Sequence, residues 1–218
     1  MKKIALIITL ALSFFSCKNN QKANGKLNIV TTTTMITDLV KNIGGSTVNI
    51  QGLMGSGVDP HLYKASEGDV TKLTEADIIF YNGLHLEGKL VEVFEKMKNK
   101  KTVAIAEALD KNTLIGSTYF ASNYDPHIWF DIDYWQQATQ YVVKTLSEAI
   151  PEQRDTFKTN GENYIKQLET LKNNITSTIE TLPKAQRILV TAHDAFNYFG
   201  KAFDFQVVGL QGLSTATE

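Results

Sequence analysis

The fold class is decided by residues 27–53, which read LNIVTTTTMITDLVKNIGGSTVNIQGL. Its first four residues form a short, mainly apolar run that is typical of a β-strand. Four apolar side chains then follow at helical spacing: Ile36, Leu39, Val40 and Ile43. They define one face of a helix, which Gly44 and Gly45 close. Val48 to Leu53 indicates a second strand, so the segment predicts a strand–helix–strand unit.

The same alternation continues along the chain. Ser66-Glu67-Gly68-Asp69 resembles a capping box, and it opens a short helix with Val70 and Leu73 inside. Further segments extend the pattern: a buried strand at 76–81, a helix at 86–97 and a strand at 102–106. Strands that alternate with helices predict an α/β fold with a mostly parallel sheet covered on both faces.

A long helix interrupts this alternation after Pro151, because proline suits a first helical turn. Apolar side chains recur at helical spacing over the next segment: Phe157, Tyr164, Leu168, Leu171, Ile175, Ile179 and Leu182. They predict one helix of about thirty residues, about 45 Å long. Its remaining faces are polar, so we interpret it as a half-solvated, rigid connector between two lobes.

The pattern of strand, helix and strand then resumes, at 187–191, 195–202 and 206–209. The predicted organisation is therefore two parallel-sheet α/β lobes joined by one long rigid helix. Its parts are an N-terminal lobe at 27–150, the connecting helix at 151–182 and a C-terminal lobe from 183 onward.

The N-terminus has the features of an export signal. A short basic start, Met1-Lys2-Lys3, precedes the apolar run 4–15, which is too short to span a bilayer core of about 30 Å. Ser16 and Cys17 follow, and the small residue before the cysteine favours a lipoprotein cleavage site. We expect a signal peptide at 1–16, a lipid on Cys17 and a linker to residue 26, which anchors an extracytoplasmic domain at the membrane. The alternative is an ordinary cleaved signal with an incidental cysteine.

The composition is that of a globular protein. Of the 218 residues, 43% are hydrophobic and 21% charged, which argues against disorder. The net charge of −1 and the lack of a basic run disfavour a nucleic-acid partner. A single cysteine excludes a disulfide scaffold and a cysteine-rich zinc site.

The residues with the clearest chemistry are histidines in a repeated phrase. Asp59-Pro60-His61-Leu62-Tyr63 and Asp125-Pro126-His127-Ile128-Trp129 share the order Asp-Pro-His-aliphatic-aromatic. Proline stiffens such a loop, the aromatic side chain can pack under it, and a carboxylate can hold the second ring nitrogen. His193 follows an apolar strand, at the strand end where α/β sheets place their ligand sites. Three imidazoles from separate segments can surround a divalent transition metal such as zinc, which leaves a fourth position for a carboxylate or water.

Each of these histidines has a purely structural alternative, as a surface or hydrogen-bonded side chain. His85 lacks the proline context, and we interpret it as a capping or surface residue. Four carboxylates are interpreted as ordinary solvated helix residues: Asp38, Glu67, Glu87 and Asp131. The sequence has no dinucleotide-binding, P-loop, serine-hydrolase or zincin motif, which weakens those functions.

Together these motifs resemble the metal-binding solute receptors of bacterial ABC importers, the zinc/manganese (cluster A-I) family. The matching segments are the lipoprotein signal, the two Asp-Pro-His phrases, Asn82-Gly83-Leu84-His85-Leu86-Glu87 and the segment 191–199, TAHDAFNYF. The resemblance implies two α/β lobes joined by a long helix, a metal in the cleft between them, and delivery to a membrane permease powered by a separate ATPase. It also implies a monomeric, lipid-anchored protein of the cell envelope, on the periplasmic face, and an adhesin role for some members.

Carried over to this sequence, the family's histidine ligands fall on His61, His127 and His193. Manganese-directed members often have Glu at the third position, so the resemblance favours Zn²⁺ over Mn²⁺ as transported ligand, in agreement with the preference of imidazole for zinc. The family's fourth ligand is an Asp in a region beyond Glu218. The resemblance therefore suggests a chain truncated at the C-terminus, with the second lobe incomplete and only a partial C-terminal α/β lobe at 183–218. The alternative from another class is an extracytoplasmic zinc-dependent hydrolase that uses the same three histidines.

Overall fold

The computed structural model describes residues 25–97, 99–117 and 123–211. The predicted signal peptide and Cys17 lie outside these residues. No helix in the described ranges combines the length and the apolar character that crossing a membrane requires. The described chain has six strands: β1 (Asn28–Thr31), β2 (Asn49–Gly52), β3 (Ile78–Tyr81), β4 (Lys101–Ala104), β5 (Ile188–His193) and β6 (Gln206–Gln211). The α-helices are α2 (Thr34–Gly44), α3 (Glu67–Glu75), α4 (Gly88–Lys96), α5 (Ile132–Ala149), α6 (Arg154–Glu180) and α7 (Asn197–Phe203).

The first four strands form a parallel sheet in the order β2-β1-β3-β4. Side chains of these strands alternate between two cores, as the period of two in a strand requires. Ile29, Ile78 and Phe80 belong to one core cluster, whereas Val30 and Ile79 belong to the other. The sheet is therefore buried on both faces, as predicted.

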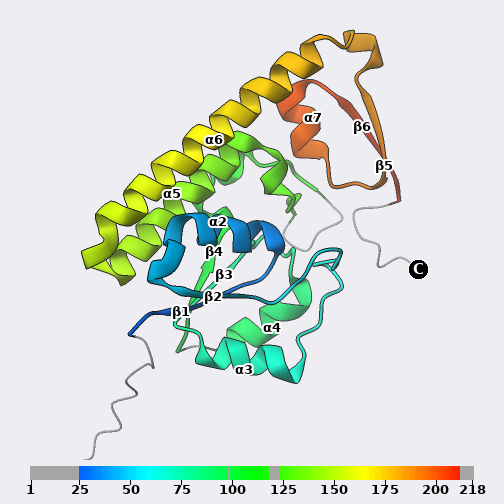
Figure 1. Cartoon of the computed structure of the whole chain (residues 1–218). Helices are drawn as coiled ribbons and strands as arrows, with labels where there is room; N and C mark the ends of the chain where they lie inside the picture. The colour runs from blue at the N-terminus through cyan, green and yellow to red at the C-terminus, as the bar shows by residue number, and fades with distance from the viewer. Residues whose placement is uncertain (1–24, 98, 118–122, 212–218) are drawn as a thin grey trace, which may run out of the picture.

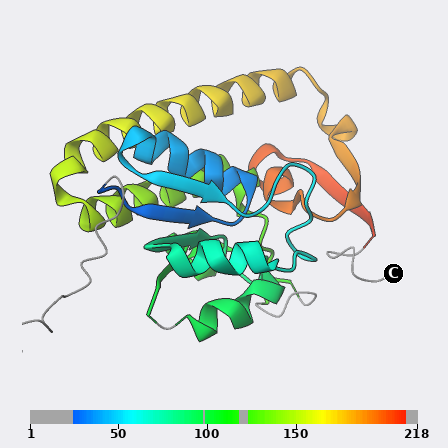
Figure 2. The same ribbon diagram turned by 60° about the horizontal axis from the view of Figure 1, so that its bottom comes forward.

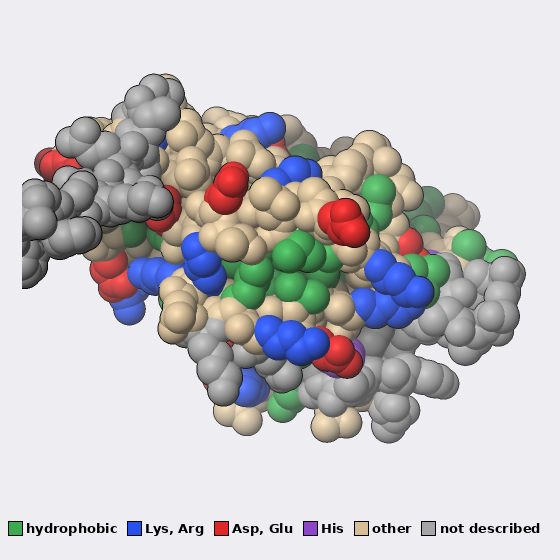
Figure 3. Space-filling model, turned by 90° about the horizontal axis from the view of Figure 1, so that it is seen from below, with side chains coloured by type: hydrophobic (Ala, Val, Ile, Leu, Met, Phe, Trp, Pro, Cys, Tyr) green, Lys and Arg blue, Asp and Glu red, His purple; other side chains and the backbone are tan. Residues whose placement is uncertain are grey.

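Helices cover the two faces in separate layers (Figures 1 and 2). Buried side chains of α2, α5 and α6 share the core of Ile29, and those of α3 and α4 share the core of Val30. Figure 3 views the outer side of α3 and α4, where acidic and basic side chains are interspersed around a small hydrophobic area. This face carries no continuous basic patch of the kind that attracts nucleic acid.

Local sequence signals account for the boundaries of these helices. Gly45 has a φ of 52° at the C-cap of α2, a conformation that glycine adopts without strain. The predicted capping box at α3 is confirmed, since Ser66 accepts from the amide of Asp69 and the Asp69 carboxylate accepts from the amide of Ser66. Leu73 is fully buried, but Val70 is 42% exposed and lies outside the core.

The predicted long helix is present and slightly shorter than expected. A 3-10 turn at Pro151–Gln153 precedes α6, which has 27 residues and so measures about 40 Å. It packs against α2 and α5 and runs from there toward the unit of β5, α7 and β6 (Figure 1). The 18-residue helix α5 was not predicted.

The last described unit is a parallel pair, β5 and β6, with α7 between them in sequence. Tyr198 and Phe203 of α7 are buried in the same core as α5 and α6, which joins this unit to the first sheet. As expected for one strand–helix–strand unit, apolar side chains of the strands are exposed; they are Ile188, Val190, Val208 and Leu210. The α/β class, with parallel sheets and one long helix, is thus confirmed.

Candidate metal centre

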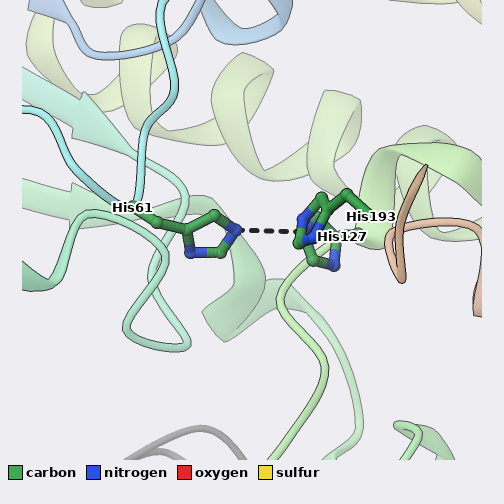
Figure 4. Close-up of side chains that lie close together, drawn as sticks. All are labelled: His61, His127 and His193. Carbon is green, nitrogen blue, oxygen red and sulfur yellow. Dashed lines mark hydrogen bonds between the residues drawn. The ribbon is translucent and has the colours of Figure 1, made fainter. Parts of the chain in front are cut away.

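Three histidines far apart in the sequence meet at one point. His61 lies in the loop between β2 and α3, His127 directly precedes the 3-10 turn η4 (Ile128–Phe130), and His193 is the last residue of β5. The Nε2 atom of His127 lies 3.2 Å from the Nε2 atoms of both other rings. One nitrogen from each histidine falls within 4.8 Å of the others, and the rings converge as Figure 4 shows.

The two Asp-Pro-His phrases form the same local turn. In each, the aspartate Oδ1 accepts a hydrogen bond from the backbone amide of the histidine two residues later. The distances are 2.8 Å from His61 to Asp59 and 2.9 Å from His127 to Asp125. This Asx-type bond, together with the proline between, fixes the backbone that carries each imidazole.

Asp125 also orients the ring of His127. Its Oδ1 lies 2.7 Å from Nδ1 of His127, and both side chains are buried. Because the carboxylate accepts the proton of Nδ1, the lone pair of Nε2 faces the other two histidines. A carboxylate that holds the second ring nitrogen was expected from the sequence, and the structure shows this contact for His127.

Residues of α7 hold Asp125 from the other side. Asn197 donates from Nδ2 to Asp125 Oδ2 at 3.0 Å, and the Tyr198 hydroxyl donates to the Asp125 carbonyl at 2.9 Å. The strand that carries His193 is therefore tied to the loop that carries His127. Asn197 and Tyr198 belong to the segment 191–199 that carries the family resemblance, but their sequence pattern assigned them no role in the site.

The aromatic residues of the two phrases support the loops in different ways. Trp129 packs edge-on against His127, with ring centroids 5.3 Å apart. The hydroxyl of Tyr63 donates to Asp69 Oδ2 at 2.7 Å, which attaches the His61 loop to the start of α3. Both aromatic side chains thus restrain the loop that carries a site histidine, as the sequence led us to expect.

The surroundings of His61 favour its neutral form. Burial lowers the pKa of His61 to about 4, and the neighbouring His127 and His193 contribute in the same direction, against the opposite effect of Asp59 and Asp125. His61 is therefore neutral at pH 7. Only the neutral ring has a free nitrogen lone pair, so this is the form that binds a metal.

The other singled-out residues lie elsewhere. His85 is exposed, and among the described residues the cluster contains only the three histidines. Asp38 and Glu67 are exposed, and Asp131 caps α5 by accepting from the amides of Asp133 and Tyr134. The interpretation of Glu87 as solvated was wrong: it is 2% exposed, because it lies under the loop that leads from β3 to α4.

Comparison with known proteins places the chain in a family. Residues 29–218 match the family described as ZnuA, zinc-uptake complex component A, periplasmic. The manganese-binding lipoprotein MntA of Bacillus subtilis is 45% identical over 91% of this chain, and the zinc-binding protein TroA of Treponema pallidum is 44% identical over 90%. The chain spans 65% and 63% of the length of these two relatives.

Solved structures agree with the sequence comparison. The structure of periplasmic zinc-binding TroA from Treponema pallidum superposes with a TM-score of 0.85 at 44% identity, over 89% of this chain and 70% of that one. The Zn(II)-bound ZnuA-like domain of Streptococcus pneumoniae AdcA gives a TM-score of 0.76 at 29% identity, over 87% and 68%. The family match over most of the sequence, together with these relatives, shows that the chain belongs to the ZnuA family of periplasmic metal-uptake proteins.

Proposed function

We propose that this chain captures a divalent transition metal outside the cytoplasm and that His61, His127 and His193 are its ligands. The metal is the cargo of the protein and not a resident cofactor. The observation that carries the proposal is the convergence of three Nε2 atoms from three separate segments. A cation placed between three such nitrogens binds a lone pair from each ring whose Nε2 carries no proton.

Zinc is the favoured cargo and manganese the alternative. Three imidazole nitrogens suit zinc, whereas manganese prefers carboxylate and water oxygens. Zinc–nitrogen bonds of about 2.0–2.1 Å in a tetrahedron place the nitrogens roughly 3.3 Å apart, close to the two separations of 3.2 Å. The relatives span both metals, because MntA is named for manganese and TroA for zinc.

The proposed cargo site lies between two lobes. The N-terminal lobe of residues 27–150 supplies His61 and His127, and the C-terminal part from residue 183 supplies His193. The separate sheets support this division, as does α6, which lies between them in the chain. Asn197 of the C-terminal part donates a hydrogen bond to Asp125 of the N-terminal lobe. This bond joins the two sides of the proposed cleft and supports its closure next to His127.

We further propose that the captured metal passes to an ABC permease driven by a separate ATPase. A monomer, anchored through a lipid on Cys17 at the outer face of a membrane, would perform this delivery. The N-terminal sequence supports the anchor, and so does the similarity to a metal ABC transporter substrate-binding lipoprotein, ScbA of Streptococcus cristatus, which is 32% identical over the whole of this chain.

The hydrolase alternative has no support from the family match, since the relatives named above are metal-binding or transport components. A zinc titration against a chelator of known affinity tests the proposal. His61→Ala, His127→Ala and His193→Ala should each weaken zinc binding, whereas His85→Ala, an exposed histidine outside the cluster, should leave it unchanged. Equal affinity of all four variants and the unsubstituted chain would refute the site.

A further inference from the structure

Glu87 is a buried carboxylate with no role in the proposed function. It is the N-cap residue of α4 and only 2% exposed. Its Oε1 accepts from the Thr32 hydroxyl at 2.6 Å and from the Asn82 amide at 2.8 Å. Thr32 directly follows β1 and Asn82 directly follows β3, so Glu87 joins the ends of two neighbouring strands.

The loop between Asn82 and Glu87 has an unusual backbone. Gly83, Leu84 and His85 all have positive φ, at 84°, 51° and 63°. This conformation is strained for leucine and histidine, and it persists only where the surroundings impose it. At Gly83 a Cβ atom would also come within 2.9 Å of the Ala104 side chain.

This loop surrounds the Glu87 carboxylate. Burial raises the pKa of Glu87, and the hydrogen bonds from the Thr32 hydroxyl and the Asn82 amide act in the opposite direction. The strained loop therefore begins at an amide that donates to this buried side chain.

Asn82 connects this network to the metal centre. Its side chain is 1% exposed, and its Nδ2 donates to the carbonyl of Pro126 at 2.9 Å. The same carbonyl accepts a second hydrogen bond, from the amide of Ile128 at 2.8 Å. The two bonds fix the carbonyl of the residue that directly precedes His127. Hydrogen bonds thus lead from Thr32 and Glu87 through Asn82 to the residue that precedes a site histidine.

Stability alone does not explain this network. Within the described ranges, Glu87 Oε2 and Asn82 Oδ1 are buried without a hydrogen-bond partner. A buried oxygen without a partner destabilises a fold relative to an apolar group of the same shape. The network instead gives a fixed position to the Pro126 carbonyl, which an apolar pair could not hold.

We propose that Glu87 and Asn82 are positioning residues for His127: Glu87 fixes Asn82, and Asn82 fixes the Pro126 carbonyl so that the imidazole stays directed at His61 and His193. The positioning is a property of the metal-free chain, and its consequence for metal binding rests on the proposed function. Figure 4 shows the arrangement that the network maintains.

Amide hydrogen exchange of the metal-free protein tests the positioning directly. Asn82→Leu and Glu87→Leu remove the two links, and each should speed exchange at the amides of His127 and Ile128 by roughly fivefold, the factor for one average hydrogen bond. Glu87→Gln keeps a carbonyl oxygen that accepts the same bonds, so it should restore the unsubstituted rates. Unchanged exchange at both amides in Asn82→Leu would overturn the proposal.

A matched control separates positioning from general destabilisation. Ile43 is a fully buried apolar residue near the end of α2, and it belongs neither to the histidine cluster nor to the hydrogen bonds of Glu87 and Asn82. Ile43→Ala should lower the thermal midpoint without selective exchange at His127 and Ile128. If Ile43→Ala accelerates these two amides as much as Asn82→Leu does, the effect is general and the proposal fails.

Metal titration of the same variants distinguishes this proposal from the proposed function. Asn82→Leu should bind zinc about 10- to 100-fold more weakly and change the visible spectrum of bound Co²⁺, whereas Ile43→Ala should change neither. Full zinc affinity and an unchanged Co²⁺ spectrum in Asn82→Leu would overturn the positioning and leave the function intact. If the unsubstituted chain binds zinc no more tightly than His127→Ala does, the proposed function fails. Hydrogen exchange of the metal-free protein then still tests whether Asn82 and Glu87 position His127.

Discussion

Asp125 offers the sharpest perturbation of the metal centre. It is fully buried, and its Oδ1 accepts from the amide of His127 at 2.9 Å and lies 2.7 Å from the ring Nδ1. Its Oδ2 accepts from Asn197 at 3.0 Å. Asp125→Asn preserves the size of the side chain but replaces one of these two acceptors with an NH₂ donor. Turned one way, the NH₂ group faces the backbone amide of His127, which is a fixed donor. Turned the other way, it faces Nδ2 of Asn197 and forces the Asn197 amide to rotate as well.

The expected magnitudes follow from these contacts. One lost hydrogen bond with buried donors left unpaired costs about 1–3 kcal/mol of unfolding free energy. The loss of negative charge behind His127 makes its imidazole a weaker ligand, and such changes lower metal affinity by about 10- to 100-fold. That factor corresponds to about 1.4–2.7 kcal/mol of binding free energy.

Two measurements and two comparison variants give the test. Urea unfolding of the metal-free protein measures stability, and competition with a chelator measures zinc affinity. Asp131→Asn is the control, since asparagine caps a helix as well as aspartate does and Asp131 caps α5. Combining Asp125→Asn with Asn197→Asp returns an acceptor to the α7 side and should recover stability. The reasoning is wrong if Asp125→Asn alone keeps the stability and zinc affinity of the unsubstituted chain.

Two further predictions concern protonation and a helix cap. Because the folded state lowers the pKa of His61 from 6.5 to about 4, the unfolded chain binds more protons in this range. The unfolding free energy of the metal-free protein should therefore fall as the pH drops from 6.5 toward 4, and it should fall by less in His61→Asn. Urea titrations at pH 7.5 and 4.5 measure the two decreases. An equal decrease in both proteins would contradict the prediction. Ser66→Ala removes the cap of α3 and should cost about 0.5–2 kcal/mol in the same assay, whereas the exposed Thr71→Ala should change little. If Ser66→Ala leaves the unfolding free energy unchanged, the capping box does not stabilise the protein.

The elements that sequence predicted well are those whose signals are local. The period of two in β1 and β3 and the helical period in α2 specify which side chains are buried, and the structure buries them accordingly. The repeated Asp-Pro-His phrase was informative for the same reason, because its Asx-type bond spans only two residues. Helix α5 also has a local signal, since Ile132, Trp135, Ala138, Val142 and Leu146 recur at helical spacing and all are buried.

The residues that sequence did not predict depend on contacts between distant segments. Glu87 is polar and precedes a helix, which is typical of a solvated side chain. Its burial depends on Thr32, 55 residues away in the sequence. Asn197 likewise meets Asp125 across 72 residues. No periodicity records such a pairing, so only the fold brings these residues to the metal centre.

X-ray absorption at the zinc edge of the zinc-loaded chain tests the central claim most directly. Three imidazole ligands predict nitrogen or oxygen neighbours at about 2.0–2.1 Å together with the outer-shell scattering that histidine rings produce. The scattering should correspond to three rings in the unsubstituted protein, to two in His193→Ala, and to three again in His85→Ala. A spectrum without imidazole scattering, or one that His193→Ala leaves unchanged, would contradict a metal centre built from His61, His127 and His193.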